Sequence, residues 1–159
     1  MNTIRIEDLP WQEQRSPSGK FRSFVRNISL ALGGKKDTGT WGGGHPFDLQ
    51  MRRVPPGATV CPYHAHQAQW ELFVVIAGRA AVRTNDATLE VGAGEAFLQA
   101  PGTAHQIRNT GGEDFVFYVI ADNPQYDSCH YPDSKKWILK PSRLCFRESS
   151  AVDYFDGEE

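Results

Sequence analysis

The sequence predicts an all-β domain, a sandwich or a barrel, and three observations lead to this fold class. Over residues 46–121, short apolar or alternating runs are separated by Pro and Gly turns at a spacing of roughly 8–12 residues. No long segment has the periodicity of an amphipathic helix. A chain of 159 residues with 40% hydrophobic residues is also long enough to bury one core of this kind.

The expected strands follow one another along this central part. Residues 47–54 (FDLQMRRV) alternate apolar and polar side chains, which is the pattern of a half-buried strand, and Pro55 ends the run. Residues 71–77 (ELFVVIA) are rich in β-branched and aromatic side chains, and Gly78 stops them. Residues 85–87 are a plausible hairpin turn. The other expected strands are 80–84, 88–91, 96–100, 105–109 and 115–121.

Two of these runs, 71–77 and 115–121, are apolar on both faces. A strand with one solvated face would show a polar side, so we expect both runs to be covered on both sides. One side would face the barrel interior. A second subunit, or the N-terminal segment folded across the strands, would cover the other.

The two ends of the chain differ from the centre in composition. Residues 1–45 are mixed and end in a glycine-rich stretch, and we expect an N-terminal extension that packs on the barrel. Residues 122–159 are polar, rich in turn formers and acidic at the end, and we expect a C-terminal extension. The predicted barrel domain therefore occupies residues 46–121.

Charge and cysteine content limit the partners and the compartment. The formal net charge is -2 and the basic residues are scattered, so we expect neither nucleic acid nor a membrane as a partner. The first residues carry acids where a secretion signal would have an apolar core. The three cysteines are too few and too far apart for a disulfide framework. We therefore expect a cytoplasmic protein with reduced thiols.

Four residues of the central part are candidates for one metal site. His64 and His66 are separated by one residue, so on a strand both imidazoles would point to the same side. Glu71 follows a short turn and can return to the same point. His105 opens a strand far away in the sequence, and a closed barrel would bring it back to the other three.

Three imidazoles and one carboxylate form a mixed nitrogen and oxygen donor set. Such a set suits a divalent transition metal (Fe, Mn, Ni, Co, Cu or Zn) better than Ca or Mg, which prefer oxygen ligands alone. The choice among these metals stays open. On a six-coordinate ion, four protein ligands would leave positions for a substrate, water or dioxygen.

These residues lie within two longer motifs. The first has Gly, a spacer, His-x-His, a short gap, Glu, six residues and Gly, and residues 57–78 read GATVCPYHAHQAQWELFVVIAG. The second has Gly, a spacer, Pro-x-Gly, two residues, His, three residues and Asn, and residues 94–109 read GEAFLQAPGTAHQIRN. The first spacer is one residue longer than usual, and Ala100 stands where the second motif has proline. With both motifs present, the sequence resembles the cupin superfamily over about residues 46–121.

The resemblance implies a double-stranded β-helix (jelly-roll) barrel, commonly a homodimer, with short N- and C-terminal extensions. It assigns the metal ligands to His64, His66, Glu71 and His105. The C-terminal sequences HYPDSKK and YFDGEE also resemble small single-barrel cupins, among them proteins labelled as sugar-phosphate isomerases.

Cupins carry out many unrelated reactions, so the fold alone does not select one. We expect a metalloenzyme that acts on a small polar or anionic metabolite, of the isomerase, decarboxylase or dioxygenase type. The alternative is a non-catalytic module that binds or senses a small molecule in the same cavity, because no acid or base partner is recognisable. Arg53 and Arg83 are candidates for contacting an anionic substrate. Cys61 invites a zinc interpretation with His64, but strand parity would point the two side chains apart.

Overall fold

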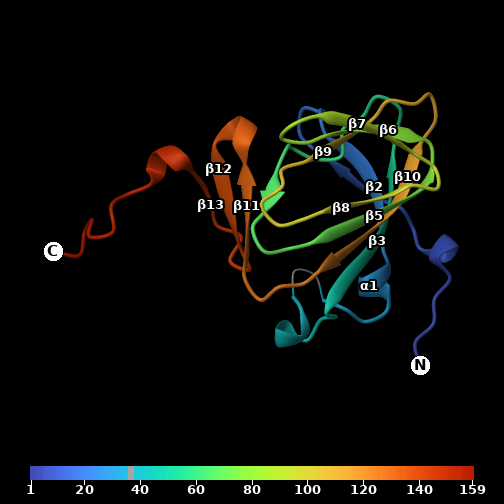
Figure 1. Ribbon diagram of the computed structural model, residues 1–159. Helices are drawn as coiled ribbons and strands as arrows, with labels where there is room; N and C mark the ends of the chain where they lie inside the picture. The colour runs from blue at the N-terminus through green and yellow to red at the C-terminus, as the bar shows by residue number, and fades with distance from the viewer. Residues whose placement is uncertain (36–37) are drawn as a thin grey trace.

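The computed structural model describes residues 1–35 and 38–159, and its regular structure is almost entirely β (Figure 1). Its strands are β1 (Gln12–Arg15), β2 (Arg22–Asn27), β3 (Phe47–Val54), β4 (Ala65–His66), β5 (Glu71–Ala77), β6 (Arg79–Arg83), β7 (Thr88–Gly92), β8 (Ala96–Gln99), β9 (Gln106–Asn109), β10 (Phe115–Asp122), β11 (Asp127–Tyr131), β12 (Lys136–Lys140) and β13 (Cys145–Arg147). The short helices are α1 (Ile28–Ala31), η1 (Ile6–Asp8), η2 (Thr40–Gly42), η3 (Pro132–Ser134) and η4 (Glu148–Ser150). Among the described residues, no helix is long and apolar enough to cross a membrane.

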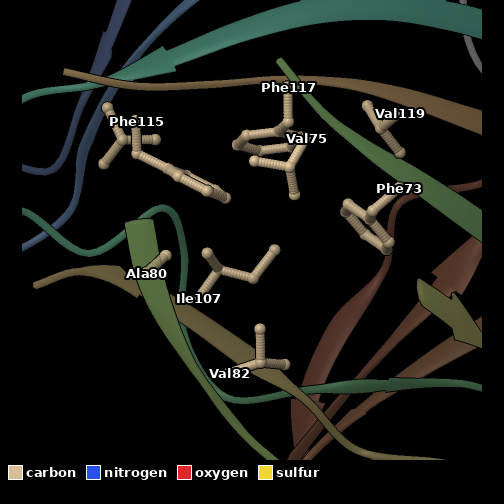
Figure 2. Close-up of a cluster of buried hydrophobic side chains, with 9 residues drawn as sticks. Phe73, Val75, Ala80, Val82, Ile107, Phe115, Phe117 and Val119 are labelled. Carbon is tan, nitrogen blue, oxygen red and sulfur yellow. The ribbon is translucent and has the colours of Figure 1, made fainter. Parts of the chain in front are cut away.

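The barrel consists of two facing antiparallel sheets. One sheet has six strands in the order β1-β2-β3-β10-β5-β8, and the other has three in the order β7-β6-β9. The core lies between them, and Figure 2 shows Phe117 and Val75 of the larger sheet opposite Val82 and Ile107 of the smaller one. Phe115 and Phe117 are fully buried in this core. The predicted jelly-roll barrel is therefore confirmed.

The central strands match the sequence prediction closely. The predicted runs 47–54 and 71–77 coincide with β3 and β5, and 115–121 is β10 without its last residue. The turn at 85–87 joins β6 to β7, which pair antiparallel. Pro55 follows the first of these runs and Gly78 the second, and such residues terminate strands for local reasons that a sequence reveals.

Both ends of the chain form strands, but only the N-terminal ones join a sheet of the barrel. At the N-terminal side, β1 pairs with β2 and β2 pairs with β3, so this segment extends the larger sheet at its edge. At the C-terminal side, β11, β12 and β13 form a separate sheet with β4, in the order β13-β12-β11-β4. Figure 1 shows this sheet to one side of the barrel. The domain limits at 45/46 and 121/122 stay predictions.

The polar side of β3 faces inward. A half-buried strand usually turns its apolar side to the core, but Asp48, Gln50 and Arg52 line the internal cavity described below. Their register partners on β10 include Phe117 and Val119, which are buried in the barrel. One end of the barrel interior is therefore polar and the other is packed with apolar side chains.

The outer face of β5 stays open in the single chain. Leu72 and Ile76 are 37% and 45% exposed, and Leu98, directly opposite Leu72 on β8, is 56% exposed. The N-terminal segment joins the sheet beside β3 and leaves these side chains uncovered. The N-terminal segment therefore does not cover this face, and its covering by a second subunit stays a prediction.

Candidate metal centre

The backbone brings His64 and His105 together. The amide N–H of His64 donates to the carbonyl of His105 at 3.1 Å, and the amide of His105 donates to the carbonyl of His64 at 2.8 Å. This isolated antiparallel bridge places the residue before β4 next to the residue before β9. Their rings lie 4.7 Å apart between centroids, so two parts of the chain that are distant in sequence meet at one point.

His66 and Glu71 complete the cluster from β4 and from the first position of β5. One potential ligand atom from each of His64, His66 and Glu71 lies within 4.8 Å of the other two. The Oε2 atom of Glu71 is 3.3 Å from Nε2 of His105 and 3.8 Å from Nε2 of His66. The structure therefore gathers all four residues that the sequence put forward.

Two of the imidazoles carry their proton on Nδ1. The Nδ1–H of His64 donates to the carbonyl oxygen of Pro62 at 3.0 Å. The Nδ1–H of His66 donates to Oδ2 of Asp127 at 2.6 Å. In a neutral imidazole the other ring nitrogen, Nε2, then has a free lone pair, which is the form that binds a metal ion.

The Glu71 carboxylate supplies the test of whether a cation fits here. Its Oε2 atom is buried and has no hydrogen-bond partner among the described residues. Burial by itself raises the pKa of this carboxyl, but the neighbouring histidines His66, His105 and His64 lower it below its usual range. A buried, ionised oxygen that accepts no hydrogen bond requires a positive charge beside it. Protonated His66 provides one in the metal-free chain, and a divalent transition metal bound to the same side chains would replace it.

Electrostatics separate the three histidines. Burial, helped by the nearby His105, lowers the pKa of His64 to about 4. Burial also lowers the pKa of His105. Burial lowers the pKa of His66 too, but the hydrogen bond to Asp127 and the contacts with Cys129 and Glu71 outweigh this effect and raise it to about 9. A metal ion at this site must therefore displace a proton from His66.

Asp127 is the functional residue that sequence reasoning missed. It begins β11, whose Cys129 pairs with His66 of β4. Its Oδ2 atom bonds to His66, and its Oδ1 atom accepts hydrogen bonds from the amide N–H groups of Gln67 and Ala68 at 3.1 and 2.9 Å. The carboxylate thus fixes both a candidate ligand and the turn that leads to Glu71. No local motif marks this position.

A second group of potential ligands overlaps the first. Atoms of His66, Asp127 and Cys129 also lie within 4.8 Å of one another, and all three residues are buried. Asp127 and Cys129 both contact Nδ1 of His66. This atom lies 3.4 Å from the Cys129 sulfur and is already hydrogen-bonded to Asp127. The set that includes Glu71 uses the free Nε2 side of the ring, and we assign the candidate metal site to it.

The candidate site lies in the wall of an internal cavity of about 280 Å³. The apolar part of its wall comes from barrel residues such as Phe73, Ile107 and Phe117. The polar part includes the inner face of β3 and, from the C-terminal sheet, Lys140. The volume lies just below the usual range for small-molecule sites, about 300–1,000 Å³, and suits a small metabolite.

Three other sequence candidates lie differently from their predictions. Arg53 points outward, where it pairs with Asp114 and lies over two aromatic rings. Arg83 forms a bidentate pair with Asp133 and also does not line the cavity. The Cys61 sulfur lies 3.7 Å from Nδ1 of His64, so the parity argument was wrong, because residues 61–63 do not form a strand. Burial raises the pKa of this thiol to about 12, which keeps it protonated.

The comparison with known proteins places the fold in one family. The family model described as Cupin domain matches residues 50–121. An oxalate-binding protein of Thermotoga maritima is 28% identical over 68 residues, which cover 43% of this chain and 55% of that protein. The chain therefore matches about half the length of this curated relative.

Solved structures agree over nearly the whole chain. A candidate sugar phosphate isomerase from Acidithiobacillus ferrooxidans superposes with a TM-score of 0.79 at 16% identity, covering 93% of this chain and 91% of its own. A sugar phosphate isomerase of the cupin superfamily from Silicibacter pomeroyi gives 0.76 at 17% identity, covering 98% of both chains. The polyketide cyclase RemF from Streptomyces resistomycificus gives 0.61 at 24% identity, covering 79% of this chain and 81% of its own. Residues 50–121 therefore form a Cupin domain, and the solved structures share the fold of the chain.

Proposed function

We propose that this protein is a metal-dependent enzyme that acts on a small polar or anionic metabolite, with the metal ion held by His64, His66, Glu71 and His105. The observation that carries this proposal is the buried Glu71 oxygen, which has no hydrogen-bond partner among the described residues and faces imidazole nitrogens in the wall of the barrel cavity. In a purely structural metal site, protein ligands fill every coordination position. Here the candidate ligands line a cavity that can hold a small molecule.

The residues of the chain have distinct tasks in this proposal. His64 and His66 present Nε2 because Pro62 and Asp127 hold their Nδ1 protons. A bound ion of this kind supplies Lewis-acid polarisation of a carbonyl or carboxylate, or a site for dioxygen. The apolar side chains of the barrel wall exclude water from one side of the ligand and so strengthen the electrostatic contacts on the other.

A proton acceptor is also available on the inner face of β3. Among the described residues that line the cavity, Asp48 is the carboxylate that neither belongs to the proposed ligand set nor bonds to one of its members. Its Oδ2 atom accepts a hydrogen bond from the Gln50 amide at 2.7 Å. Asp48 is therefore the candidate for moving a proton to or from a substrate, a role for which the sequence offered no residue.

The relatives support a small ligand and leave the reaction class open. Their names include an oxalate-binding protein and sugar phosphate isomerases, which differ in chemistry. The first of these names also keeps a binding module as the second candidate function. Isomerase, decarboxylase and dioxygenase activities are the three enzyme classes to be tested.

The test is a turnover screen with the metal-loaded protein and a matched variant. Sugar phosphates, keto acids and dioxygen uptake are assayed with the wild type and with Glu71→Gln, which keeps the shape of the side chain and removes its charge. The proposal expects turnover of at least one substrate class by the wild type and its loss in the variant. Saturable ligand binding without turnover would instead establish the binding module, and equal turnover by both proteins would remove the metal site from the reaction.

A further inference from the structure

The inner face of β3 carries a ladder of polar side chains. Gln50 links the two charged ends of this ladder, donating to Asp48 at 2.7 Å and accepting from Nη2 of Arg52 at 3.0 Å. The Nη1 group of Arg52 donates to Gln14 at 3.0 Å and to Ser23 at 3.4 Å. All the hydrogen-bond acceptors recorded for Arg52 are therefore uncharged groups.

This guanidinium differs from other arginines of the barrel. Arg22 and Arg53 each have a carboxylate partner, at 2.8 and 3.4 Å, and both lie on the outside of the sheet. Arg52 forms no ion pair with any described residue, although its side chain lines the cavity. The other described cation of the cavity wall, Lys140, is 3.5 Å from the Asp127 carboxylate. Arg52 is thus the cation of this wall that has no direct carboxylate partner among the described residues.

Part of the guanidinium also remains free to bind. Arginine has five N–H groups, and the bonds to Gln14, Ser23 and Gln50 engage Nη1 and one N–H of Nη2. The Nε–H and the second N–H of Nη2 have no acceptor among the described residues. Two neighbouring N–H groups of this kind bind a planar oxyanion through two parallel hydrogen bonds.

We propose that Arg52 binds a carboxylate of the substrate and so makes this site specific for small monocarboxylic acids. The inference rests on the proposed function, because it places the rest of the acid toward the metal ligands in the same cavity. One negative charge balances Arg52. Asp48 is linked to Arg52 through Gln50, so at this end of the cavity a singly charged carboxylate meets less repulsion than a phosphate, which carries more negative charge.

The experiment compares binding of three probes by titration calorimetry. Pyruvate carries the carboxylate, pyruvamide replaces it with a neutral amide, and inorganic phosphate supplies the rival anion. The proteins are the wild type, Arg52→Met and Arg53→Met, in metal-loaded and metal-free forms. Arg53 is the matched control because it is the next residue on the same strand and faces outward with Asp114.

The expected result is that the wild type prefers pyruvate to pyruvamide and to phosphate, and that Arg52→Met loses about tenfold or more in pyruvate affinity, as for a charge-assisted bidentate contact. Arg53→Met should bind pyruvate as the wild type does. Equal pyruvate affinity of Arg52→Met and the wild type would overturn the proposal. So would a preference for phosphate, or the absence of saturable pyruvate binding.

Metal content, measured on the same samples, separates this proposal from the function on which it rests. One outcome is that the wild type binds no metal and still binds pyruvate more tightly than Arg52→Met does. The carboxylate site is then supported, and the metalloenzyme proposal fails. If metal is bound stoichiometrically by the wild type and by Arg52→Met while their pyruvate affinities agree, the assignment of Arg52 fails alone.

Discussion

The Nδ1 atom of His66 lies 2.6 Å from Oδ2 of Asp127, and this contact connects the candidate metal centre to the C-terminal part of the chain. Asp127 is buried, and it also holds the turn after His66 through two backbone amides. A carboxylate in this position fixes the orientation of the imidazole and increases its basicity toward a metal ion. The C-terminal sheet is therefore part of the construction of the site.

The first prediction concerns this contact. Asp127→Asn should weaken metal binding about 10- to 100-fold, because the neutral amide no longer supports the charge on His66. Competition with a chromophoric chelator measures the affinity, and circular dichroism checks the fold. Asp133→Asn is the control, since Asp133 is exposed and pairs with Arg83 away from the cavity. Unchanged affinity in Asp127→Asn would contradict the role given to Asp127.

A second prediction follows from the burial of His64, whose pKa of about 4 lies below the ordinary value of 6.5. The unfolded chain takes up this proton at a higher pH than the folded one. Acidification therefore favours unfolding, and the free energy of unfolding of the metal-free protein should fall as pH drops from about 6.5 to about 4. Urea titrations at several pH values measure it. In His64→Gln the free energy of unfolding should fall less between pH 6.5 and pH 4. The same pH profile in the variant and the wild type would refute the lowered pKa of His64.

The third prediction tests the core. Phe117 is fully buried between the two sheets, so Phe117→Ala should lower the free energy of unfolding by about 3–5 kcal/mol. Phe155→Ala is the comparison, because Phe155 is 63% exposed in the C-terminal tail and its removal should change stability by less than about 0.5 kcal/mol. Denaturant unfolding gives both values. Equal effects would mean that the facing sheets do not pack as described.

The fourth prediction concerns the open outer face of β5 and β8. Leu72 and Leu98 are exposed opposite each other, and we predict that a second copy of the chain covers them in a homodimer. Sedimentation analysis should give a dimer for the wild type and a monomer for Leu98→Glu. Leu144→Glu, at a residue 62% exposed between β12 and β13 of the C-terminal sheet, should remain dimeric. A monomeric wild type would refute this prediction. The cytoplasmic location also stays a prediction.

The central strands could be predicted because their signals are local. Runs such as 71–77 are bounded by turn residues, and their composition favours strands whatever surrounds them. His64, His66 and Glu71 could be named for a similar reason, since their spacing acts over a few positions. His105 lies far away in the sequence and was assigned from the second motif of the cupin resemblance. Within residues 1–45 no element was predicted, and the structure has β2 and α1 there.

The remaining features depend on contacts between distant residues. Asp127 lies in a polar stretch, and its role appears only when β11 pairs with β4. The alternation of residues 47–54 predicted a strand, but it did not show which side of the strand faces the cavity. In the structure Arg52 faces inward and Arg53 faces outward. The sequence argument chose Arg53 because an isolated run does not reveal which side meets the interior. Cys61 was misplaced because parity was applied to a segment that is not a strand.

The metal content of three variants tests the central claim most directly. Mass spectrometry of natively purified protein should find about one transition-metal ion per chain in the wild type. His66→Ala and Glu71→Gln should lose most of it while circular dichroism shows an intact β fold. His130→Ala should retain it, because His130 is on β11 but bonds to Glu148 outside the cluster. Unchanged metal content in folded His66→Ala and Glu71→Gln would contradict the assignment of this site.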